Sequence, residues 1–351
     1  LSKVPVEFWS TPKRVLEPCC GKGNFVLGIF QKFDDGLKEK YPDTPVRHQV
    51  IVEQCINFTD LSPLNVFITI ELLRCASGNV AHFYNSRVGD TLGMKWDDRF
   101  DAVIGNPPYN RGKNSNFYTG FITFSQGVMD DDGLLVFVIP NRFLVKDHKA
   151  NKICNTLQMT YIHHTLKDFV GISTDIGFFV ATVTSGKVDN TRIKTNKGYL
   201  INLNNPTPTK TDDEMYKRIS DKIMAYPTKF TFKGVKEFVA GDDLFLPRHW
   251  TRFSPDKKCG GSHVFQIFDE VGPDGRCLRV TDDDQEWVKW YLTRCKAVRF
   301  FTAIYASSVF IPPFMWSSIP LPPGRPFTDD EVFASLGFDD SEISFIHSNF
   351  S

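Results

Sequence analysis

Twelve residues near the start of the sequence carry the pattern of a strand, a glycine turn and a helix: Arg14-Val15-Leu16-Glu17-Pro18-Cys19-Cys20-Gly21-Lys22-Gly23-Asn24-Phe25. Residues 14–17 predict a strand, and the apolar run 25–33 predicts a helix. Gly21 and Gly23 lack a Cβ, so the backbone of the turn can approach a ligand closely, and the helix start offers unpaired N–H groups. The glycine spacing is not that of the dinucleotide fingerprint, which disfavours NAD. We therefore expect a nucleoside-type cofactor at this turn, where Glu17 and Pro18 precede the two glycines.

Strand-like and helical patterns alternate after this stretch, which is typical of a parallel sheet with helices on both faces. Further strands are predicted at 49–53, 100–104, 134–139, 161–166 and 176–184. Helices are predicted at 60–76, with Leu64, Phe67, Ile68 and Leu72 toward the core, and at 117–128, with Phe117, Phe121, Phe124 and Val128 toward the core. The regular pattern ends near residue 186, so we expect a first domain at 1–186 and a second, mixed α/β domain at 187–351.

Two acidic residues follow predicted strands. A nucleoside bound at the glycine turn usually needs an acid at the end of the second strand to accept its ribose hydroxyls, and Glu53 has this place in the predicted order. The polar insert 34–48 accounts for its long separation from Glu17. Asp90 follows a third strand-like stretch and is the candidate acceptor for an adenine amine. The alternative for each acid is a solvated strand end or a turn.

The candidate reaction centre is Asn106-Pro107-Pro108-Tyr109, directly after the apolar strand at 100–104. The nitrogen of an aromatic amine is a poor nucleophile because its lone pair is delocalised into the ring. The Asn106 side-chain oxygen and the Pro107 carbonyl can accept its two hydrogens and localise the lone pair, while the prolines keep the corner free of N–H donors. Tyr109 offers a flat face for a base to stack on. An ordinary Asn-Pro-Pro turn is the alternative.

These motifs, in this order, resemble the adenine-N6 amino-methyltransferases of type II restriction–modification systems. The resemblance implies a Rossmann-like, seven-stranded, mostly parallel sheet whose last strand is reversed, S-adenosylmethionine as the cofactor, and a C-terminal target-recognition domain. It assigns a set of residues to the cofactor loop: Glu17, Pro18, Gly21, Gly23 and Phe25. It assigns Glu53 to the ribose, Asp90 to the adenine of the cofactor, and Asn106 to both the cofactor and catalysis. It also makes Phe169 a candidate second stacking partner for the target base, beside Tyr109; an ordinary core Phe is the alternative.

The two ends of the sequence bear on the same resemblance. The C-terminal part resembles the tails of type II and phage-encoded adenine methyltransferases, ending in a short helix from Leu336 to Ile346. At the other end, the family's segment over the methionine end of the cofactor is nearly absent. Either it lies upstream of Leu1, or residues 5–9 cover the cofactor differently.

Composition limits the class of protein. The 351 residues hold 41 basic and 41 acidic side chains, which argues against a polyelectrolyte-type nucleic-acid binder. No apolar run is long enough to span a bilayer, and no signal peptide is evident. None of the 8 cysteines forms a Cys-x-x-Cys pair, so no metal is expected, and a cytoplasmic location in a bacterial or virus-infected cell is the natural expectation, with the nucleus for a eukaryotic host.

Double-stranded DNA is the expected partner, and the enzyme must extrude the target base to reach it. Residues 187–301 hold 21 Lys and Arg against 16 Asp and Glu, so DNA contacts are expected there. The candidates form two groups: Lys210, Lys217, Arg218, Lys222, Lys229, Lys233 and Lys236, and then Arg276, Arg279, Lys289, Arg294, Lys296 and Arg299, interleaved with Trp287, Trp290 and Tyr291. Most of them could equally lie on a solvated face.

Several functional alternatives stay open from the sequence. A monomer with a separate restriction endonuclease fits the resemblance. The same tetrapeptide also serves enzymes that methylate a glutamine amide of a protein, a base of ribosomal RNA, or cytosine N4 in DNA. A non-catalytic subunit that binds DNA or cofactor is a further alternative.

Overall fold

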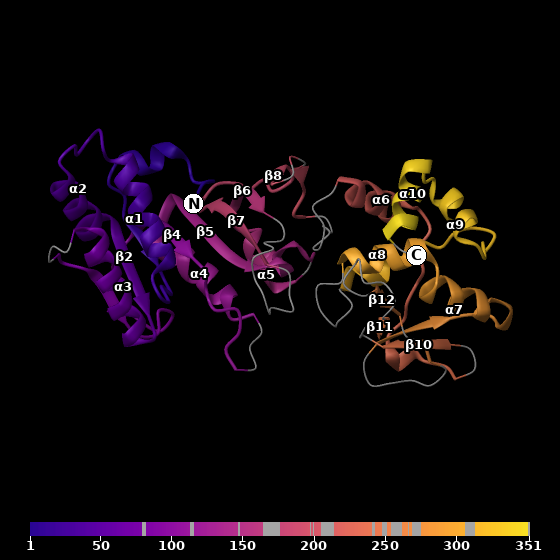
Figure 1. The fold of residues 1–351 in the computed structure, drawn as a ribbon. Coiled ribbons are helices and arrows are strands. Elements are labelled where there is room, and N and C mark those ends of the chain that lie inside the picture. Colours follow the sequence, from indigo (N-terminus) through magenta and orange to yellow (C-terminus); the bar gives the residue numbers. More distant parts are fainter. Residues whose placement is uncertain are drawn as a thin grey trace. The chain divides into compact units, whose positions relative to one another are not determined.

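The computed structural model describes most of the chain, in two compact units (Figure 1). The described residues are 1–78, 82–112, 116–146, 148–163, 176–196, 198, 200–204, 214–240, 243–247, 251–253, 262–265, 267–268, 275–305 and 313–349. Unit 1 holds those within 1–143, 149–163 and 176–204, and unit 2 holds those within 144–148 and 205–349. Within these ranges, no helix combines the length and the apolar character needed to cross a membrane.

A single large sheet forms the centre of unit 1. Its strands, nine within the described ranges, are β1 (Val15–Glu17), β2 (Ile56–Asp60), β3 (Asn85–Val88), β4 (Phe100–Gly105), β5 (Met129–Pro140), β6 (Gln158–His163), β7 (Ile176–Thr182), β8 (Ile193–Thr195) and β9 (Leu200–Ile201). Their order is β3-β2-β1-β4-β5-β7-β6-β8-β9. Neighbours from β3 to β5 are parallel, whereas β7 runs antiparallel between β5 and β6. The prediction of a mostly parallel methyltransferase sheet with a reversed seventh strand is confirmed, with two strands added.

The two added strands move the division of the chain. Strand β8 pairs with β6, and β9 pairs with β8, so residues up to Asn204 continue the sheet of unit 1. The division therefore falls at Asn204 and not near residue 186 as predicted. The polar stretch after residue 186, predicted to begin the second domain, contains two short strands of the first sheet.

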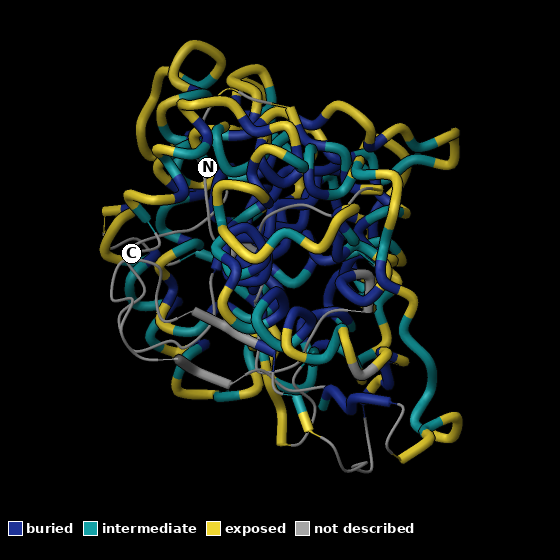
Figure 2. The backbone as a smooth tube through the Cα atoms, turned by 90° about the vertical axis from the view of Figure 1, so that its right-hand side faces the viewer, coloured by how far each residue is buried: buried dark blue, intermediate teal, exposed yellow. Residues whose placement is uncertain are grey.

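The helices of unit 1 lie between the strands in sequence: α1 (Asn24–Gly36), α2 (Thr44–Val50), α3 (Pro63–Ala76), α4 (Tyr118–Val128) and α5 (Lys149–Cys154). Short 3-10 turns span Val6–Ser10 and Asn141–Leu144. Helices α1 and α3 pack together, as do α4 and α5. Strand β4 and most of β5 are buried, which is typical of a parallel sheet covered on both faces. Buried stretches of the backbone are dark blue in Figure 2.

The predicted strand at 49–53 is wrong. Helix α2 begins after Asp43, whose side chain accepts the N–H of Val46, and it continues into a π-helical turn, Ile51–Cys55, before β2 starts at Ile56. The run 50–52 is buried, and a short buried apolar run looks alike in a helix and in a strand. Arg47 of α2 is buried and pairs with Asp34, which fixes the helix against α1.

The predicted core face of α3 is also wrong. The helix forms at Pro63–Ala76, but it buries Val66, Thr69 and Leu73. Leu64 and Phe67, expected in the core, are 62% and 59% exposed. At the N-terminus, Trp9 packs on Phe33 near the end of α1, so residues 5–9 lie far along this helix from its glycine turn.

Unit 2 is mixed α/β, as predicted. Its helices are α6 (Glu214–Ala225), α7 (Gln285–Thr293), α8 (Lys296–Tyr305), α9 (Asp329–Leu336) and α10 (Asp340–Asn349), with 3-10 turns at Val235–Glu237, Asp282–Asp284 and Pro313–Ser317. Strands β10 (Asp243–Pro247) and β13 (Gly275–Arg279) pair antiparallel, as do β11 (Thr251–Phe253) and β12 (Ser262–Val264). The helix predicted from Leu336 to Ile346 is two helices, because Gly337 at φ 69° ends α9.

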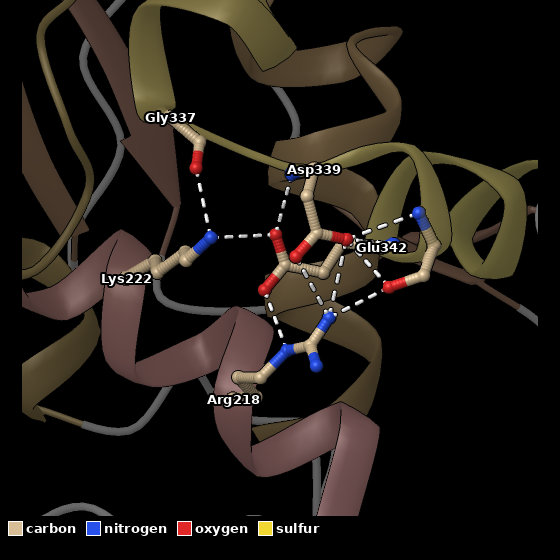
Figure 3. Close-up of polar contacts among 6 residues, drawn as sticks. Arg218, Lys222, Gly337, Asp339 and Glu342 are labelled. Carbon is tan, nitrogen blue, oxygen red and sulfur yellow. Dashed lines mark hydrogen bonds and ion pairs between the residues drawn. The ribbon is translucent and has the colours of Figure 1, made fainter.

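A buried carboxylate fastens α6 to α10 (Figure 3). Glu342 has no exposed side-chain surface, and its two oxygens accept hydrogen bonds from Arg218 Nε at 2.8 Å and Lys222 Nζ at 2.7 Å. Arg218 also pairs with Asp339, and Lys222 also donates to the Gly337 carbonyl. Burial acts to raise the pKa of Glu342, but hydrogen bonds from Lys222, the Asp339 N–H and Arg218 outweigh it and hold the pKa below the ordinary 4.5.

We expect Glu342→Gln to lower the free energy of unfolding by about 1–3 kcal/mol at neutral pH, because two cations lose their buried charged partner. The lowered pKa means that this contribution is present above the unfolded-state pKa of 4.5 and is lost as pH falls through the folded-state value. Urea unfolding of both proteins between pH 3 and 7 should therefore give curves that converge in acid. Glu286→Gln, at an exposed site on α7, is the control. A pH-independent difference would contradict this role.

Candidate active site

The ends of four parallel strands bring three of the predicted site residues, Glu17, Asp90 and Asn106, to one edge of the sheet, together with Asp60, which was not predicted. Glu17 ends β1, Asp60 ends β2, Asp90 follows β3, and Asn106 follows β4. These strands are adjacent and parallel, and the register pairs Asp60 with Val88. Because the carboxyl ends of parallel strands share one edge, loops from all four strands meet there.

The glycine turn lies at this edge and needs its glycines. Gly21 and Gly23 have φ of 52° and 81°, in the left-handed region that side chains with a Cβ rarely adopt. The Gly21 N–H donates to Asp60 Oδ2 at 2.9 Å, and Gly23 is the N-cap of α1. No atom lies within 4 Å of where a Cβ of Gly21 would be, so the described residues leave room above this backbone for a ligand.

Glu17 is buried behind the turn. Its Oε1 accepts the Cys19 N–H at 3.2 Å, and burial raises the pKa of this carboxyl to about 8. A Cβ at Gly105 would collide with the carboxyl, so the glycine before Asn106 makes room for Glu17. The side chain therefore connects the end of β1 to the start of the tetrapeptide Asn106–Tyr109. Its neighbour Pro18 accepts a 2.7 Å hydrogen bond from Thr91, which joins the glycine turn to the loop after β3.

The predicted ribose acid Glu53 lies elsewhere. It belongs to the π-helical turn before β2, at the amino edge of the sheet, where its backbone carbonyl accepts a 2.7 Å hydrogen bond from Asn85. It lines a cavity of about 360 Å³ there together with Pro12, Lys13, Arg14, Gln54, Asn57 and Asn85. Glu53 therefore does not join the other predicted cofactor residues.

Sequence reasoning missed Asp60, which ends β2 and meets the glycine turn. Besides the Gly21 N–H, this carboxylate accepts the Ser62 N–H at 2.8 Å and Asn65 Nδ2 at 3.0 Å. A signal was present in the sequence, because Asp60 stands between the run 56–59 and Ser62-Pro63, a good helix start.

Asp90 lies in the loop after β3 and has two donors. Its Oδ1 accepts the Leu92 N–H at 3.2 Å, and its Oδ2 pairs with Arg111 at 2.7 Å. The hydrogen bond from Arg111 holds the pKa of Asp90 below its ordinary value. Asp90 is thus a carboxylate, as an acceptor for an amine should be.

The tetrapeptide follows β4 directly. The Asn106 side-chain oxygen is inaccessible to solvent, and none of the described residues donates a hydrogen bond to it. Pro107 is buried, and Pro108 is exposed. Tyr109 is half-buried, with its ring edge-on to Tyr118 at 6.5 Å, and burial raises the pKa of its hydroxyl to about 12. Tyr109 therefore stays an uncharged aromatic surface at physiological pH.

Two predicted residues remain. Phe25, in the first turn of α1, is half-buried and packs against the core. Phe169 lies outside the described residues.

Several basic residues proposed to contact DNA have partners inside unit 2. Arg218 and Lys222 pair with Glu342, Lys217 pairs with Asp221, and Arg279 pairs with Asp243. Trp287 and Tyr291 are core residues. The interleaving of basic and aromatic residues on α7 thus reflects a helix with one buried face.

Residues 62–172 match the family model of the Eco57I restriction-modification methylase. The matched segment runs from the start of α3 past the tetrapeptide and β5, and it covers less than a third of the chain. No curated protein matches the chain.

Among solved structures, the chain is similar to three subunits of type I restriction systems. The EcoKI M protein is 13% identical, with 98% of this chain and 70% of that chain covered and a TM-score of 0.43. A modification subunit from Vibrio vulnificus is 20% identical, with 54% of this chain and 44% of that chain covered and a TM-score of 0.41. A methyltransferase subunit from Streptococcus thermophilus is 14% identical over 55% and 46%, with a TM-score of 0.39. The chain thus spans less than half of the length of the last two.

The family match and the site agree on the class of protein. The strand order defines the sheet of S-adenosylmethionine-dependent methyltransferases, and the matched model is that of a methylase. The prediction of S-adenosylmethionine as the cofactor is confirmed by the family match. The open space above Gly21 and the unpaired oxygen of Asn106 among the described residues fit such a group.

We expect the pKa of Glu17 to be about 8 in the folded chain and 4.5 in the unfolded chain, so the folded chain keeps this proton to a higher pH. This contribution to stability is fully present below pH 4.5 and is lost as pH rises through 8. Glu17→Gln removes this contribution. In urea unfolding without cofactor, the free energy of unfolding should therefore fall less steeply between pH 5 and 8 in the variant than in the wild type, and the two slopes should differ by up to about 1.4 kcal/mol per pH unit. Parallel pH profiles for wild type and variant would show that Glu17 is not protonated. Glu286→Gln is again the control.

Proposed function

We propose that this protein is a site-specific DNA methyltransferase that transfers the methyl group of S-adenosylmethionine to the N6 amine of adenine. The observation that carries the proposal is the buried, unpaired oxygen of Asn106 among the described residues, at the end of β4 and beside the glycine turn. The match of residues 62–172 to a restriction-modification methylase supports a DNA substrate.

In this proposal the cofactor lies along the carboxyl edge of β1 to β4. The turn Glu17–Phe25, with Gly21 and Gly23, would hold its methionine end, and Asp90 its adenine amine. Asp60 replaces Glu53 as the acceptor for the ribose hydroxyls, because Asp60 ends β2 and already orients the Gly21 backbone. Leu61 and Val88 beside these acids are 64% and 53% exposed and offer apolar surface for the adenine ring.

The tetrapeptide would act on the target amine. Bound S-adenosylmethionine would supply a methyl group that is electrophilic because it is attached to a sulfonium, with S-adenosylhomocysteine as the leaving group. The nitrogen that gains the methyl group would lose one of its hydrogens as a proton to solvent. Asn106 Oδ1 and the Pro107 carbonyl accept the two amine hydrogens, which pulls the nitrogen toward tetrahedral geometry and localises its lone pair. Tyr109 stacks on the extruded base and holds it in line for transfer.

We further propose that unit 2 recognises the DNA target. The exposed Arg294 follows α7, and Arg276 lies on β13, so these two stay candidates after the paired residues are set aside. Phe169 remains the candidate for a second stacking residue. A protein that acts as a monomer, with any restriction endonuclease on a separate chain, is the simplest assembly for these parts.

We expect Asn106→Ala to lower turnover on the order of a hundredfold or more, because the lost acceptor matters most as the amine becomes tetrahedral. Binding of S-adenosylmethionine should change far less. Transfer of a labelled methyl group to DNA, followed by mass spectrometry of the digested nucleosides, measures both turnover and product. Asn85→Ala, at the opposite edge of the sheet, is the matched control.

The product of the same assay tests the substrate. We expect N6-methyladenine. Recovery of N4-methylcytosine would change the base and keep the mechanism. Methyl transfer to a protein glutamine or to ribosomal RNA, with none to DNA of varied sequence, would contradict the proposal.

A further inference from the structure

Arg111 lies two residues after Tyr109 and reaches across to the loop after β3. Its Nη1 donates to Asp90 Oδ2 at 2.7 Å. The other oxygen of Asp90 accepts the Leu92 N–H. The carboxylate is therefore fixed by two donors from different loops, and a carboxylate has further lone pairs for a third donor. This is the acid to which the proposed function assigns the adenine amine of the cofactor.

The same guanidinium group also contacts the segment that carries the base-stacking ring. The guanidinium carbon of Arg111 lies 5.3 Å from the centre of the Phe117 ring. The backbone N–H of Phe117 in turn donates to the Tyr109 carbonyl at 3.0 Å. A continuous series of contacts thus runs from Asp90 through Arg111 and Phe117 to Tyr109. It joins the proposed cofactor acid to the proposed stacking residue without passing through the core.

These contacts contribute little to the stability of the fold. The side chains of Arg111 and Asp90 are 53% and 39% exposed, and ion pairs of this kind are worth about 0–1 kcal/mol. Removing the pair should therefore leave the fold intact. Its effect should appear instead in the arrangement of the two loops that it joins.

We propose that Arg111 is a positioning residue that couples occupancy of the cofactor site to the placement of Tyr109. This inference rests on the proposed function. A cofactor amine bound at Asp90 holds that carboxylate in place, and the fixed carboxylate holds Arg111, Phe117 and the Tyr109 backbone. By linkage the effect is reciprocal, so a base stacked on Tyr109 tightens cofactor binding by the same factor.

The test compares wild type with Arg111→Met, which keeps the length of the side chain without its charge, and Arg111→Lys, which keeps the charge. Arg87→Met is the matched control, because Arg87 also pairs with an acid, Asp98 at 2.6 Å, and stacks on Trp96 at 4.3 Å, away from the tetrapeptide. S-adenosylhomocysteine is the probe. The first readout is its effect on the DNA Kd, and the second is hydrogen exchange of backbone amides 109–118 without DNA.

We expect S-adenosylhomocysteine to lower the wild-type DNA Kd by roughly five- to tenfold. In Arg111→Met this factor should fall to within about twofold, in Arg111→Lys it should be partly restored, and in Arg87→Met it should be unchanged. The probe should also slow exchange at 109–118 in wild type but not in Arg111→Met, while the thermal midpoints stay alike.

Equal coupling and equal protection in wild type and Arg111→Met would overturn the inference and leave the proposed function standing. Protection that depends on Arg111, in a protein that does not methylate DNA, would support the coupling and contradict the DNA substrate. A wild-type chain that does not bind S-adenosylhomocysteine would overturn both.

Discussion

The hydrogen bond from the Gly21 N–H to Asp60 is the interaction on which the site depends. It requires the left-handed backbone at Gly21 and places the turn after β1 against the end of β2. Thr91 then joins the loop after β3 to the same turn through the Pro18 carbonyl. Hydrogen bonds between backbone and side-chain atoms thereby hold three loops, each from a separate strand, at one edge of the sheet. The proposed reaction centre, which follows β4, lies next to them.

This edge is rich in acceptors, and that determines what it can bind. Asp60, Asp90 and the Asn106 oxygen, which is unpaired among the described residues, are suited to accept hydrogen bonds from groups such as ribose hydroxyls and amines. Glu17 is different: burial raises its pKa to about 8, so its carboxyl is mostly protonated at neutral pH. Arg111, a cation at this edge, pairs with Asp90 and lies against the Phe117 ring.

Much of the fold could be predicted from the sequence, because β1, β4 and β5 are apolar runs between clear turn signals and Asn106 follows directly on its strand. The failures have physical reasons. The run 50–52 is buried in a helical segment and gives the same apolar signal as a strand. Glu53 was therefore predicted at the end of the second strand, a place that Asp60 has in the structure. Leu64 and Phe67 have helical spacing but lie on the exposed side of α3, and spacing alone does not say which face meets the sheet. The pairing of Arg111 with Asp90 joins loops that are distant in sequence, so no local pattern could reveal it.

The central claim is that the cofactor is held at the carboxyl edge of the sheet, by the acid that orients Gly21. Calorimetric titration of S-adenosylmethionine into wild type, Asp60→Asn and Glu53→Gln tests it most directly, with circular dichroism to confirm that each variant is folded. Loss of a charge-assisted hydrogen bond should weaken binding to Asp60→Asn by about 1–3 kcal/mol, and binding to Glu53→Gln should match the wild type. Weakened binding to Glu53→Gln with unchanged binding to Asp60→Asn would contradict the account and place the cofactor at the opposite edge.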